Sequence, residues 1–260
     1  MAAPLTLIRV IDTETTGIDD PAEMVELGWC DVRLFPDGWA VERGPESVLV
    51  NPGMPISFPA MAVHHISDAM VRQAADPNDL RAEIVKGVDY ICAHNAAFDS
   101  RFIRGHNVPW LCTFKGARTA WPEMQSHGNG SIRYERGLLL DDKRCEPSHR
   151  AGPDTWVTAH ILLDLLKIYE PETLAEISRN PVLQITCWLK AHRGKRWSEV
   201  PSNYLDWIVN KSDMRNDPAS EDVLFTARHH LAKREQAGAI EAPSAGAPDP
   251  DAWRNTAGAF

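Results

Sequence analysis

The first apolar run of the chain, Thr6–Ile11, leads directly into two carboxylates, Asp12 and Glu14. The run is rich in β-branched residues, which predicts a strand. Residues two apart in a strand point to the same face, so both carboxylates aim in one direction. Gly17 then allows the chain to turn sharply away. The strand therefore exposes an acidic pair at its end.

The order of the expected elements defines the fold class. Two further strands follow the first and form a hairpin around Pro36–Gly38, and then two short strands alternate with helices. This order predicts an α/β fold, a mixed five-stranded sheet flanked by helices. The expected strands are Thr6–Ile11, Met24–Phe35, Trp39–Val50, Asp89–Ala93 and Trp110–Thr113; the expected helices are Asp79–Val88, Ala96–Arg104 and Asp154–Tyr169; Pro52–Pro59 is expected to be loop, and Gln125–Ser148 a helix fragment plus a long loop.

Composition divides the chain into three parts. Its 260 residues suffice for one full-sized domain and a smaller appendage. The α/β pattern occupies residues 1–171, and residues 172–236 form a small Trp-rich, partly basic C-terminal module. Residues 237–260 are rich in Ala, Pro and Gly, which predicts a disordered tail.

Cysteine usage and hydropathy exclude several classes of protein. The five cysteines are scattered and form no CxxC pair, which excludes a disulfide framework and a cysteine-built zinc module. No apolar stretch is long enough to span a bilayer, and the first residues do not resemble a secretory signal. We therefore expect a cytoplasmic protein without membrane contact. The net charge of −9 argues mildly against nucleic acid, although a global sum can hide local basic patches.

Two more acidic residues stand where helices are expected to begin. Asp99 ends the sequence HNAAFD after a strand, and Asp154 ends HRAGPD at the start of the long helix. Clustered carboxylates repel one another, and a hard divalent cation such as Mg²⁺ or Mn²⁺ relieves that repulsion. Two such ions about 3.5–4 Å apart suit in-line phosphoryl displacement. His149 could then take a proton from the attacking water.

Each carboxylate taken singly has a structural alternative. Asp12 and Asp154 could cap a helix or turn, and Asp99 could be a favourable charge at a helix N-terminus. The spacing of all of them together with His149 favours a metal site.

The three motifs IDTETTG, HNAAFD and HRAGPD occur in this order over about residues 5–170. In this the chain resembles the DnaQ-like 3′–5′ exonucleases of the RNase H-like fold, in the histidine-bearing subgroup with four acidic residues (DEDDh). Met61–Val71 and Arg193–Val209 resemble the exodeoxyribonuclease X branch. The chain departs from the usual third motif by having Gly152-Pro153 before Asp154. Proline suits a first helical turn, so we expect a shifted helix start and not a lost ligand.

The resemblance implies a role for each motif residue. Asp12, Glu14, Asp99 and Asp154 would hold two divalent metal ions, Mg²⁺ or Mn²⁺, and His149 would be the general base. The reaction would release nucleoside 5′-monophosphates from a 3′ end. The residues implied to contact the terminal nucleotides are Thr15, Gly17, Ile18, His64, Asn95 and Phe98. Their types alone leave simpler readings open, since Phe98 could belong to the core, Asn95 to a turn and His64 to the loop surface.

Two basic segments offer a route for nucleic acid. Arg101–Arg118 and Cys187–Ser198 each contain four basic residues and no acidic one. In the C-terminal module, aromatic residues interleave with the second segment: Trp188, Trp197, Tyr204 and Trp207. Such interleaving suits a nucleic-acid platform, but it also fills the core of a small domain. The module could grip duplex DNA or dock a partner protein.

The leading interpretation is a metal-dependent 3′–5′ exodeoxyribonuclease acting on DNA, with a role in DNA repair suggested by the resemblance. An exoribonuclease is a rival, because these motifs do not reveal tolerance of the 2′-hydroxyl and RNA stays possible. A proofreading partner of a polymerase and a non-catalytic nucleic-acid-binding scaffold are further alternatives. The C-terminal run favours DNA.

Overall fold

The computed structural model describes residues 6–138, 140–217 and 220–236 and divides into two compact units. The first unit comprises residues 6–120 and 124–179, and the second comprises residues 121–123 and those from 180 onward. The first unit runs to Arg179, past the expected boundary at 171, because helix α9 (Pro171–Arg179) packs against strand β5 (Trp110–Cys112). The expected tail, 237–260, lies outside the described residues.

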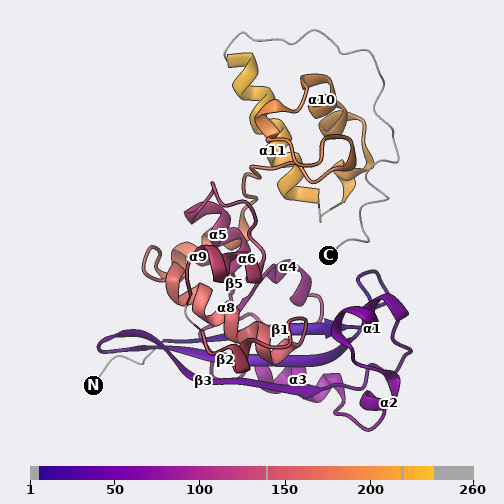
Figure 1. Ribbon diagram of the computed structural model, residues 1–260, viewed down its shortest axis with the longest axis vertical. Coiled ribbons are helices and arrows are strands. Elements are labelled where there is room, and N and C mark those ends of the chain that lie inside the picture. The colour runs from indigo at the N-terminus through magenta and orange to yellow at the C-terminus, as the bar shows by residue number, and fades with distance from the viewer. Residues whose placement is uncertain (1–5, 139, 218–219, 237–260) are drawn as a thin grey trace. The chain divides into compact units, whose positions relative to one another are not determined.

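A five-stranded sheet in the order β3-β2-β1-β4-β5 forms the first unit (Figure 1). Strand β1 (Leu7–Thr15) is central and pairs antiparallel with β2 (Met24–Phe35), which pairs antiparallel with β3 (Gly38–Leu49). On its other side β1 pairs parallel with β4 (Tyr90–Ala93), and β4 with β5. The predicted mixed five-stranded sheet flanked by helices is confirmed.

Strand β1 is longer than expected. Its register with β2 runs from Leu7 opposite Arg33 to Thr15 opposite Met24, so Asp12 and Glu14 lie within the paired strand. Gly17 is not among the glycines with positive φ, so its freedom to adopt such a conformation is not what turns the chain. The acidic pair is therefore held in the sheet by the pairing of β1 with β2, whereas the pairing with β4 ends at Val10.

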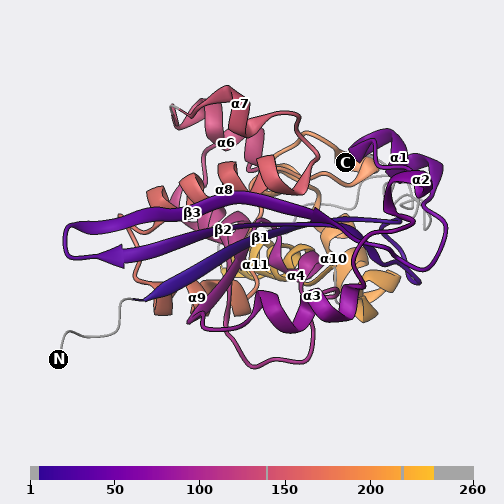
Figure 2. The same ribbon diagram turned by 90° about the horizontal axis from the view of Figure 1, so that it is seen from below.

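Helices cover the two faces of this sheet (Figure 2). Helix α8 (Ala151–Leu165) packs on β1, β2 and β3 from one side. From the other side, Ile84 of α3 (Pro77–Ile84) joins a buried cluster with Ile11 and Ile91. Helix α8 begins before the expected Asp154 and takes Pro153 into its first turn, as the departure in the third motif predicts.

The remaining helices of the first unit are short. The helix expected over Ala96–Arg104 ends at Asp99. The chain then continues in turns closed by backbone hydrogen bonds, such as the one that Phe102 N–H donates to Asp99 O. The segment expected to be loop, Pro52–Pro59, ends two residues early, because Phe58 begins a helix. The short helices of the first unit are α1 (Phe58–His64), α2 (Asp68–Val71), α4 (Ala96–Asp99), α5 (Thr113–Ala120), α6 (Asn129–Glu135) and α7 (Asp142–Cys145).

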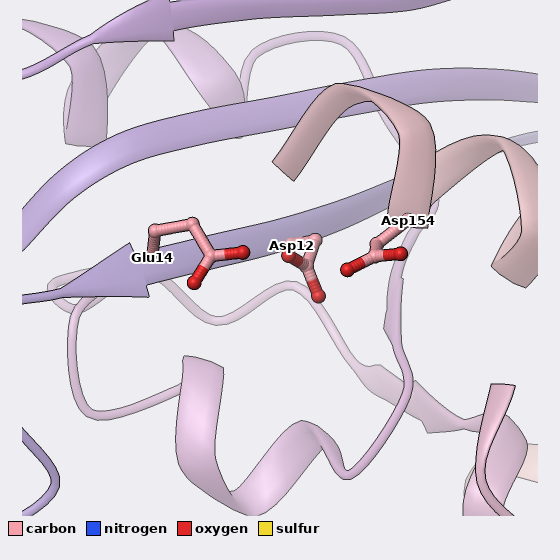
Figure 3. A group of neighbouring side chains, drawn as sticks. All are labelled: Asp12, Glu14 and Asp154. Atoms are coloured by element: carbon pink, nitrogen blue, oxygen red, sulfur yellow. The ribbon is translucent and has the colours of Figure 1, made fainter. Parts of the chain in front are cut away.

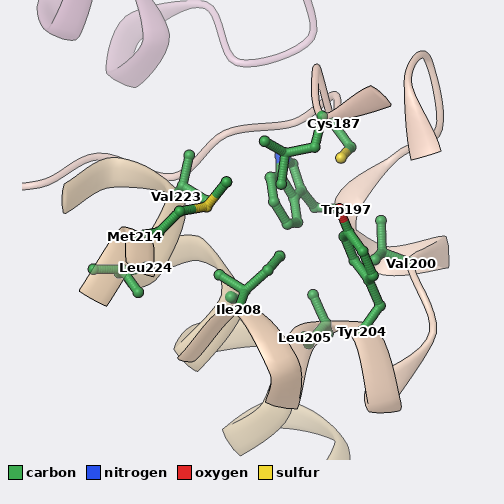
Figure 4. Packing of buried hydrophobic residues seen from close by; sticks show 11 residues of the cluster. Cys187, Trp197, Val200, Tyr204, Leu205, Ile208, Met214, Val223 and Leu224 are labelled. Atoms are coloured by element: carbon green, nitrogen blue, oxygen red, sulfur yellow. The ribbon is translucent and has the colours of Figure 1, made fainter. Parts of the chain in front are cut away.

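The second unit has a core of its own, built around Trp197 (Figure 4). Trp197 is completely buried, and Tyr204 and Ile208 pack in the same cluster. Its elements are the helices α10 (Ser202–Asn210) and α11 (Glu221–Gln236) and the 3₁₀ turns η1 (Lys190–His192), η2 (Trp197–Glu199) and η3 (Asp213–Asn216). Among the described residues, no helix combines the length and the apolar character that crossing a bilayer requires.

Candidate active site

Three carboxylates from two elements converge on one point beside the sheet. Asp12 and Glu14 extend from the same face of β1, and Asp154 extends from the first turn of α8 (Figure 3). One carboxylate oxygen from each lies within 4.8 Å of the others. All three side chains are half-buried, so the cluster remains open to a ligand from solvent.

Gly28 brings the third carboxylate close to the first. It lies directly opposite Asp12 in the pairing of β1 with β2. A Cβ atom at Gly28 would lie only 2.3 Å from the carbonyl carbon of Ala151, so a side chain here would collide with the backbone of α8. The first turn of α8 therefore rests directly on β2, which places Asp154 beside Asp12.

Glu26 fixes the same end of α8 from the sheet. Its buried carboxylate accepts two hydrogen bonds of 2.8 Å from the Arg150 guanidinium and one of 3.1 Å from the Ala151 N–H. Ser47 Oγ donates a further bond of 2.9 Å. A carboxylate at a helix N-terminus satisfies an otherwise unpaired N–H and favours the helix dipole. Glu26 thus caps α8 across the sheet.

The two kinds of carboxyl in this region titrate in opposite directions. Burial alone would raise the pKa of Glu26, but the hydrogen bonds from Arg150, Ala151 and Ser47 hold it below its ordinary value. Burial, followed by the charges of neighbouring carboxylates, raises the pKa of Asp12 well above its ordinary value and that of Glu14 to about 8. Glu26 therefore keeps its charge while the cluster resists acquiring one.

Asp154 is the least perturbed member of the cluster. Burial raises its pKa to about 6, and the charge of His149 together with the bond from its N–H opposes that rise. The His149 N–H donates to Asp154 Oδ2 at 3.0 Å. The same carboxylate therefore faces the cluster and holds the backbone of the preceding loop.

Asp99 lies outside the group of three. It is buried at the end of α4, where its Oδ1 accepts hydrogen bonds from Thr13 N at 3.1 Å and from Thr13 Oγ1 at 2.8 Å. Burial raises its pKa to about 7, and its charge raises the pKa of both Asp12 and Glu14. Asp99 therefore borders the cluster electrostatically and ties α4 to β1.

The donor set fits a hard divalent cation. Its atoms are all carboxylate oxygens, and no ion pair of the described residues involves Asp12 or Glu14. Burial, followed by mutual repulsion, raises the pKa values of the cluster, and a bound cation offsets both costs. Oxygen ligands with open positions for water match Mg²⁺ or Mn²⁺. The acidic cluster is thus a metal-binding group in its chemistry.

His149 presents an exposed side chain next to the cluster. Its backbone has a φ of +59°, in the left-handed region that non-glycine residues rarely occupy. The bond from its N–H to Asp154 holds the backbone there, since Asp154 is itself fixed in the first turn of α8. The side chain of His149 is therefore open to solvent.

His64 sits buried against the turn that follows β1. Ile66 N–H donates to its Nδ1 at 3.0 Å, so Nδ1 is an acceptor and Nε2 carries the proton that is donated to Thr15 O at 3.1 Å. Burial lowers the pKa of His64, which keeps this ring neutral. Both ring nitrogens are thus engaged with backbone, and His64 holds the Thr15–Gly17 segment in place.

The other residues expected to meet a nucleotide differ in exposure. Ile18 is 47% exposed, whereas Thr15 is buried and its hydroxyl donates to Gly17 O. Asn95 is exposed at a φ of +67° and its side chain makes no capping bond. Phe98 is half-buried and makes an edge contact with Phe102. Ile18 and Asn95 are therefore the exposed members of the set, and Gly17 and Phe98 are half-buried.

Three residues that shape the site were not singled out from the sequence: Glu26, Gly28 and Arg150. Glu26 and Gly28 sit in an alternating strand, where they read as ordinary strand residues. The available signal was their register, because the pairing of β1 with β2 places Glu26 opposite Glu14 and Gly28 opposite Asp12. A buried acid beside an acidic pair requires a cation, and Arg150 supplies it.

The family model described as "Exonuclease" matches residues 10–162, which contain the whole cluster. The chain belongs to the exonuclease family. "Exodeoxyribonuclease 10" of Escherichia coli K12 is 34% identical over 230 residues, covering 86% of this chain and 99% of that protein. The expectations of a 3′–5′ exonuclease fold, an enzyme of this family and a likeness to the exodeoxyribonuclease X branch are confirmed.

Solved structures agree with this assignment. The structure titled "Exonuclease X in complex with 5′ overhanging duplex DNA" matches with a TM-score of 0.56 and 33% identity, covering 66% of this chain and 99% of that chain. A "DNA polymerase III subunit epsilon-like protein" of Rhodobacter capsulatus is 32% identical, but the match covers 60% of this chain and only 23% of that protein. The 230 residues aligned to the E. coli relative exceed the first unit, so the likeness to it extends into the second.

Proposed function

We propose that the protein is a Mg²⁺- or Mn²⁺-dependent 3′–5′ exodeoxyribonuclease that releases nucleoside 5′-monophosphates from DNA. The observation that carries this proposal is the convergence of Asp12, Glu14 and Asp154 in a chain of the exonuclease family. The E. coli relative, named as an exodeoxyribonuclease, aligns over 99% of its length, which supports DNA as the substrate.

The proposed ligands of two divalent ions are Asp12, Glu14, Asp99 and Asp154. When bound, such ions activate water and neutralise charge on a transferring phosphate and its leaving group. The chain's own part is to hold the oxygen donors in place. Sheet pairing holds Asp12 and Glu14, Glu26 and Gly28 hold the turn that carries Asp154, and Thr13 holds Asp99.

His149 is the proposed general base. The oxygen of a water molecule bonds to the terminal phosphorus, and His149 accepts the proton that the water loses. The bond from phosphorus to the 3′ oxygen breaks, its electron pair goes to that oxygen, and the oxygen takes up a proton from solvent as the 3′-hydroxyl of the shortened strand. General-base catalysis of this kind contributes about 10²–10⁴-fold. The exposed ring of His149 beside Asp154 supports this role. The residues proposed to border the terminal nucleotides are Thr15, Gly17, Ile18, His64, Asn95 and Phe98. His64 would act through its hydrogen bond to the Thr15 backbone.

A free-standing repair enzyme is the proposed setting. The polymerase-related protein matches this chain over only 23% of its own length, so that likeness covers the exonuclease segment and gives no support to a polymerase partner. The repair role rests on the resemblance to the exodeoxyribonuclease X branch. A cytoplasmic location agrees with the five cysteines, all of which are buried and none of which forms a disulfide.

Digestion of 5′-labelled DNA and RNA oligonucleotides of matched sequence tests the proposal. With Mg²⁺ or Mn²⁺ the DNA should shorten from its 3′ end in a ladder, and the Asp12→Ala variant and EDTA should each abolish it. Shortening of RNA alone would replace the substrate class and retain the mechanism. If neither the DNA nor the RNA oligonucleotide is cleaved in a metal-dependent way, the catalytic proposal is refuted in favour of a binding scaffold.

A further inference from the structure

We propose that residues 186–196 of the second unit, here called the basic loop, bind single-stranded nucleic acid independently of the active site. Trp188 would stack on a base, and Lys190 and Lys195 would contact backbone phosphates. This inference rests on the proposed function, because the strand it would bind is the substrate of the first unit. It assigns a ligand to a part of the chain that lies beyond the matched exonuclease segment, residues 10–162.

Hydrogen bonds close the basic loop at its base. Thr186 and Arg196 form an antiparallel bridge, Cys187 N–H donates to Lys195 O at 2.8 Å, and Gly194 N–H donates to Cys187 O at 2.8 Å. Gly194 adopts a φ of +84°, which a glycine tolerates without strain. The loop is therefore ordered before any ligand arrives, which reduces the entropy lost on binding.

Alternation along the loop separates anchors from exposed groups. Cys187 and Leu189 are completely buried in the core of the second unit, whereas Trp188 between them is 41% exposed. The indole Nε1 of Trp188 donates to Gln184 Oε1 at 3.1 Å, which fixes the orientation of the ring. Trp197, by contrast, is wholly buried and fills the core (Figure 4). The ring of Trp188 is thus held in one orientation and remains partly exposed, because it does not fill the core.

The charge of the loop is uniformly positive. Residues 181–198 contain Lys190, Arg193, Lys195 and Arg196 and no acidic residue, and all four side chains are exposed. Arg196 pairs with Glu123 at 3.3 Å and Arg193 Nε lies 3.4 Å from Trp188 O. In the described part of the chain, Lys190 and Lys195 have no anionic partner. The chain as a whole carries −9, so these lysines are a local exception to its charge.

An exposed aromatic ring beside unpaired cations suits a single strand better than a duplex. Bases of a single strand offer free faces for stacking, which contributes about 1–3 kcal/mol per base, while cations follow the phosphates. A duplex buries these faces and would use only the cations. The loop therefore favours the single-stranded region that a 3′ end presents when it is frayed or overhanging.

Fluorescence anisotropy of the full chain with a labelled oligothymidylate of about 20 nucleotides tests the inference. EDTA in the buffer prevents digestion. Trp188→Ala should weaken binding about 10-fold without changing its salt dependence, because stacking involves no counterion. Lys190→Ala/Lys195→Ala should reduce the slope of log Kd against log salt by about 1.4, since two phosphate contacts are lost. Lys211→Ala/Lys233→Ala makes the same charge change elsewhere in the unit and should leave the slope within error.

Unchanged affinity in both loop variants would overturn the inference, as would equal loss with blunt duplex of the same length. Hydrolysis of the p-nitrophenyl ester of thymidine 5′-monophosphate separates this outcome from failure of the proposed function. This ester carries no strand for the loop to bind, so the loop variants should hydrolyse it at the wild-type rate. If the wild type cannot hydrolyse it with Mn²⁺, the proposed function fails and the binding result stands alone.

Discussion

Arg150 and Glu26, far apart in the sequence, form a two-bonded ion pair at the N-terminus of α8. The pair joins β2, at the residue opposite Glu14, to the residue that directly follows His149. Glu26 is 1% exposed, so its charge depends on Arg150 and on the Ala151 N–H. This relationship connects the stability of the sheet to the position of the proposed base and of Asp154.

Removing the Glu26 carboxylate should affect both folding and turnover. Glu26→Ala leaves Arg150 and the Ala151 N–H without their acceptor, so we expect the free energy of unfolding to fall by about 3 kcal/mol. Because α8 carries Asp154, kcat should also fall. Urea unfolding and single-turnover digestion measure the two effects. Glu83→Ala is the control, since it removes an exposed pair with Lys86 and should cost less than about 1 kcal/mol.

Gly28→Ala tests whether the close approach of α8 to β2 positions the site. The new methyl would meet the Ala151 backbone at 2.3 Å, so the helix must shift. We expect a destabilisation of about 1–3 kcal/mol and a loss of metal-dependent activity as Asp154 moves away from Asp12. Gly130→Ala is the matched control, because nothing lies within 4 Å of its added Cβ in α6. That variant should retain full activity; equal activity of the two would refute the positioning role.

The metal-free fold should lose stability as pH rises. The folded-state pKa values of Asp154, Asp99 and Glu14 are raised to about 6, 7 and 8, and that of Asp12 well above normal. Between about pH 4 and pH 8 these four carboxyls therefore bind more protons in the folded chain than in the unfolded chain, so their contribution to stability falls through this window. Buried histidines such as His64 titrate in the opposite sense below about pH 7, so in EDTA Tm should decrease between pH 7 and pH 8, and Mg²⁺ in excess of EDTA should reverse the decrease.

Asp12→Asn isolates that effect. It removes one charge from the cluster, so in EDTA it should raise Tm at pH 8 and flatten the pH dependence while abolishing activity. Asp37→Asn removes an exposed charge in the β2–β3 turn and should leave the pH dependence unchanged. A Tm that rises with pH in EDTA equally for wild type and Asp12→Asn would contradict the repulsion account.

His149→Asn should lower kcat about 100-fold or more while leaving the affinity for DNA and Mn²⁺ within twofold of the wild type. Asparagine tolerates the left-handed backbone at this position, so the variant removes the ring without straining the loop. His65→Asn makes the same change at an exposed histidine with a φ of 60° and should retain wild-type kcat. Parallel losses of affinity and rate in His149→Asn would argue that the ring binds rather than accepts a proton.

Sequence reasoning located most of the sheet and the motif residues because these depend on local patterns. The alternation in Met24–Phe35 predicted β2 with the bounds that the structure shows. Helix α1 was missed, since its buried contact is a polar residue, His64, bound to a distant backbone oxygen. The shifted start of α8 was expected from Pro153, but the acceptor that caps it, Glu26, lies on another element and was not.

The same distinction applies within the site. The three motifs predicted which carboxylates matter, and Asp12, Glu14 and Asp154 do converge. The motifs do not reveal that the carboxylate of Asp99 accepts hydrogen bonds from Thr13. These bonds depend on the parallel pairing of β1 with β4, which brings α4 next to β1. Gly28 is likewise informative only once its register with Asp12 is known. Contacts across elements therefore supplied what local spacing lacked.

Calorimetric titration of the full chain with Mn²⁺, in the presence of a nucleoside 5′-monophosphate, tests the central claim that the acidic cluster is a two-metal centre. The wild type should bind two ions per chain and Asp12→Asn should lose this binding, whereas Asp37→Asn should bind as the wild type does. No binding by the wild type, or undiminished binding by Asp12→Asn, would contradict it.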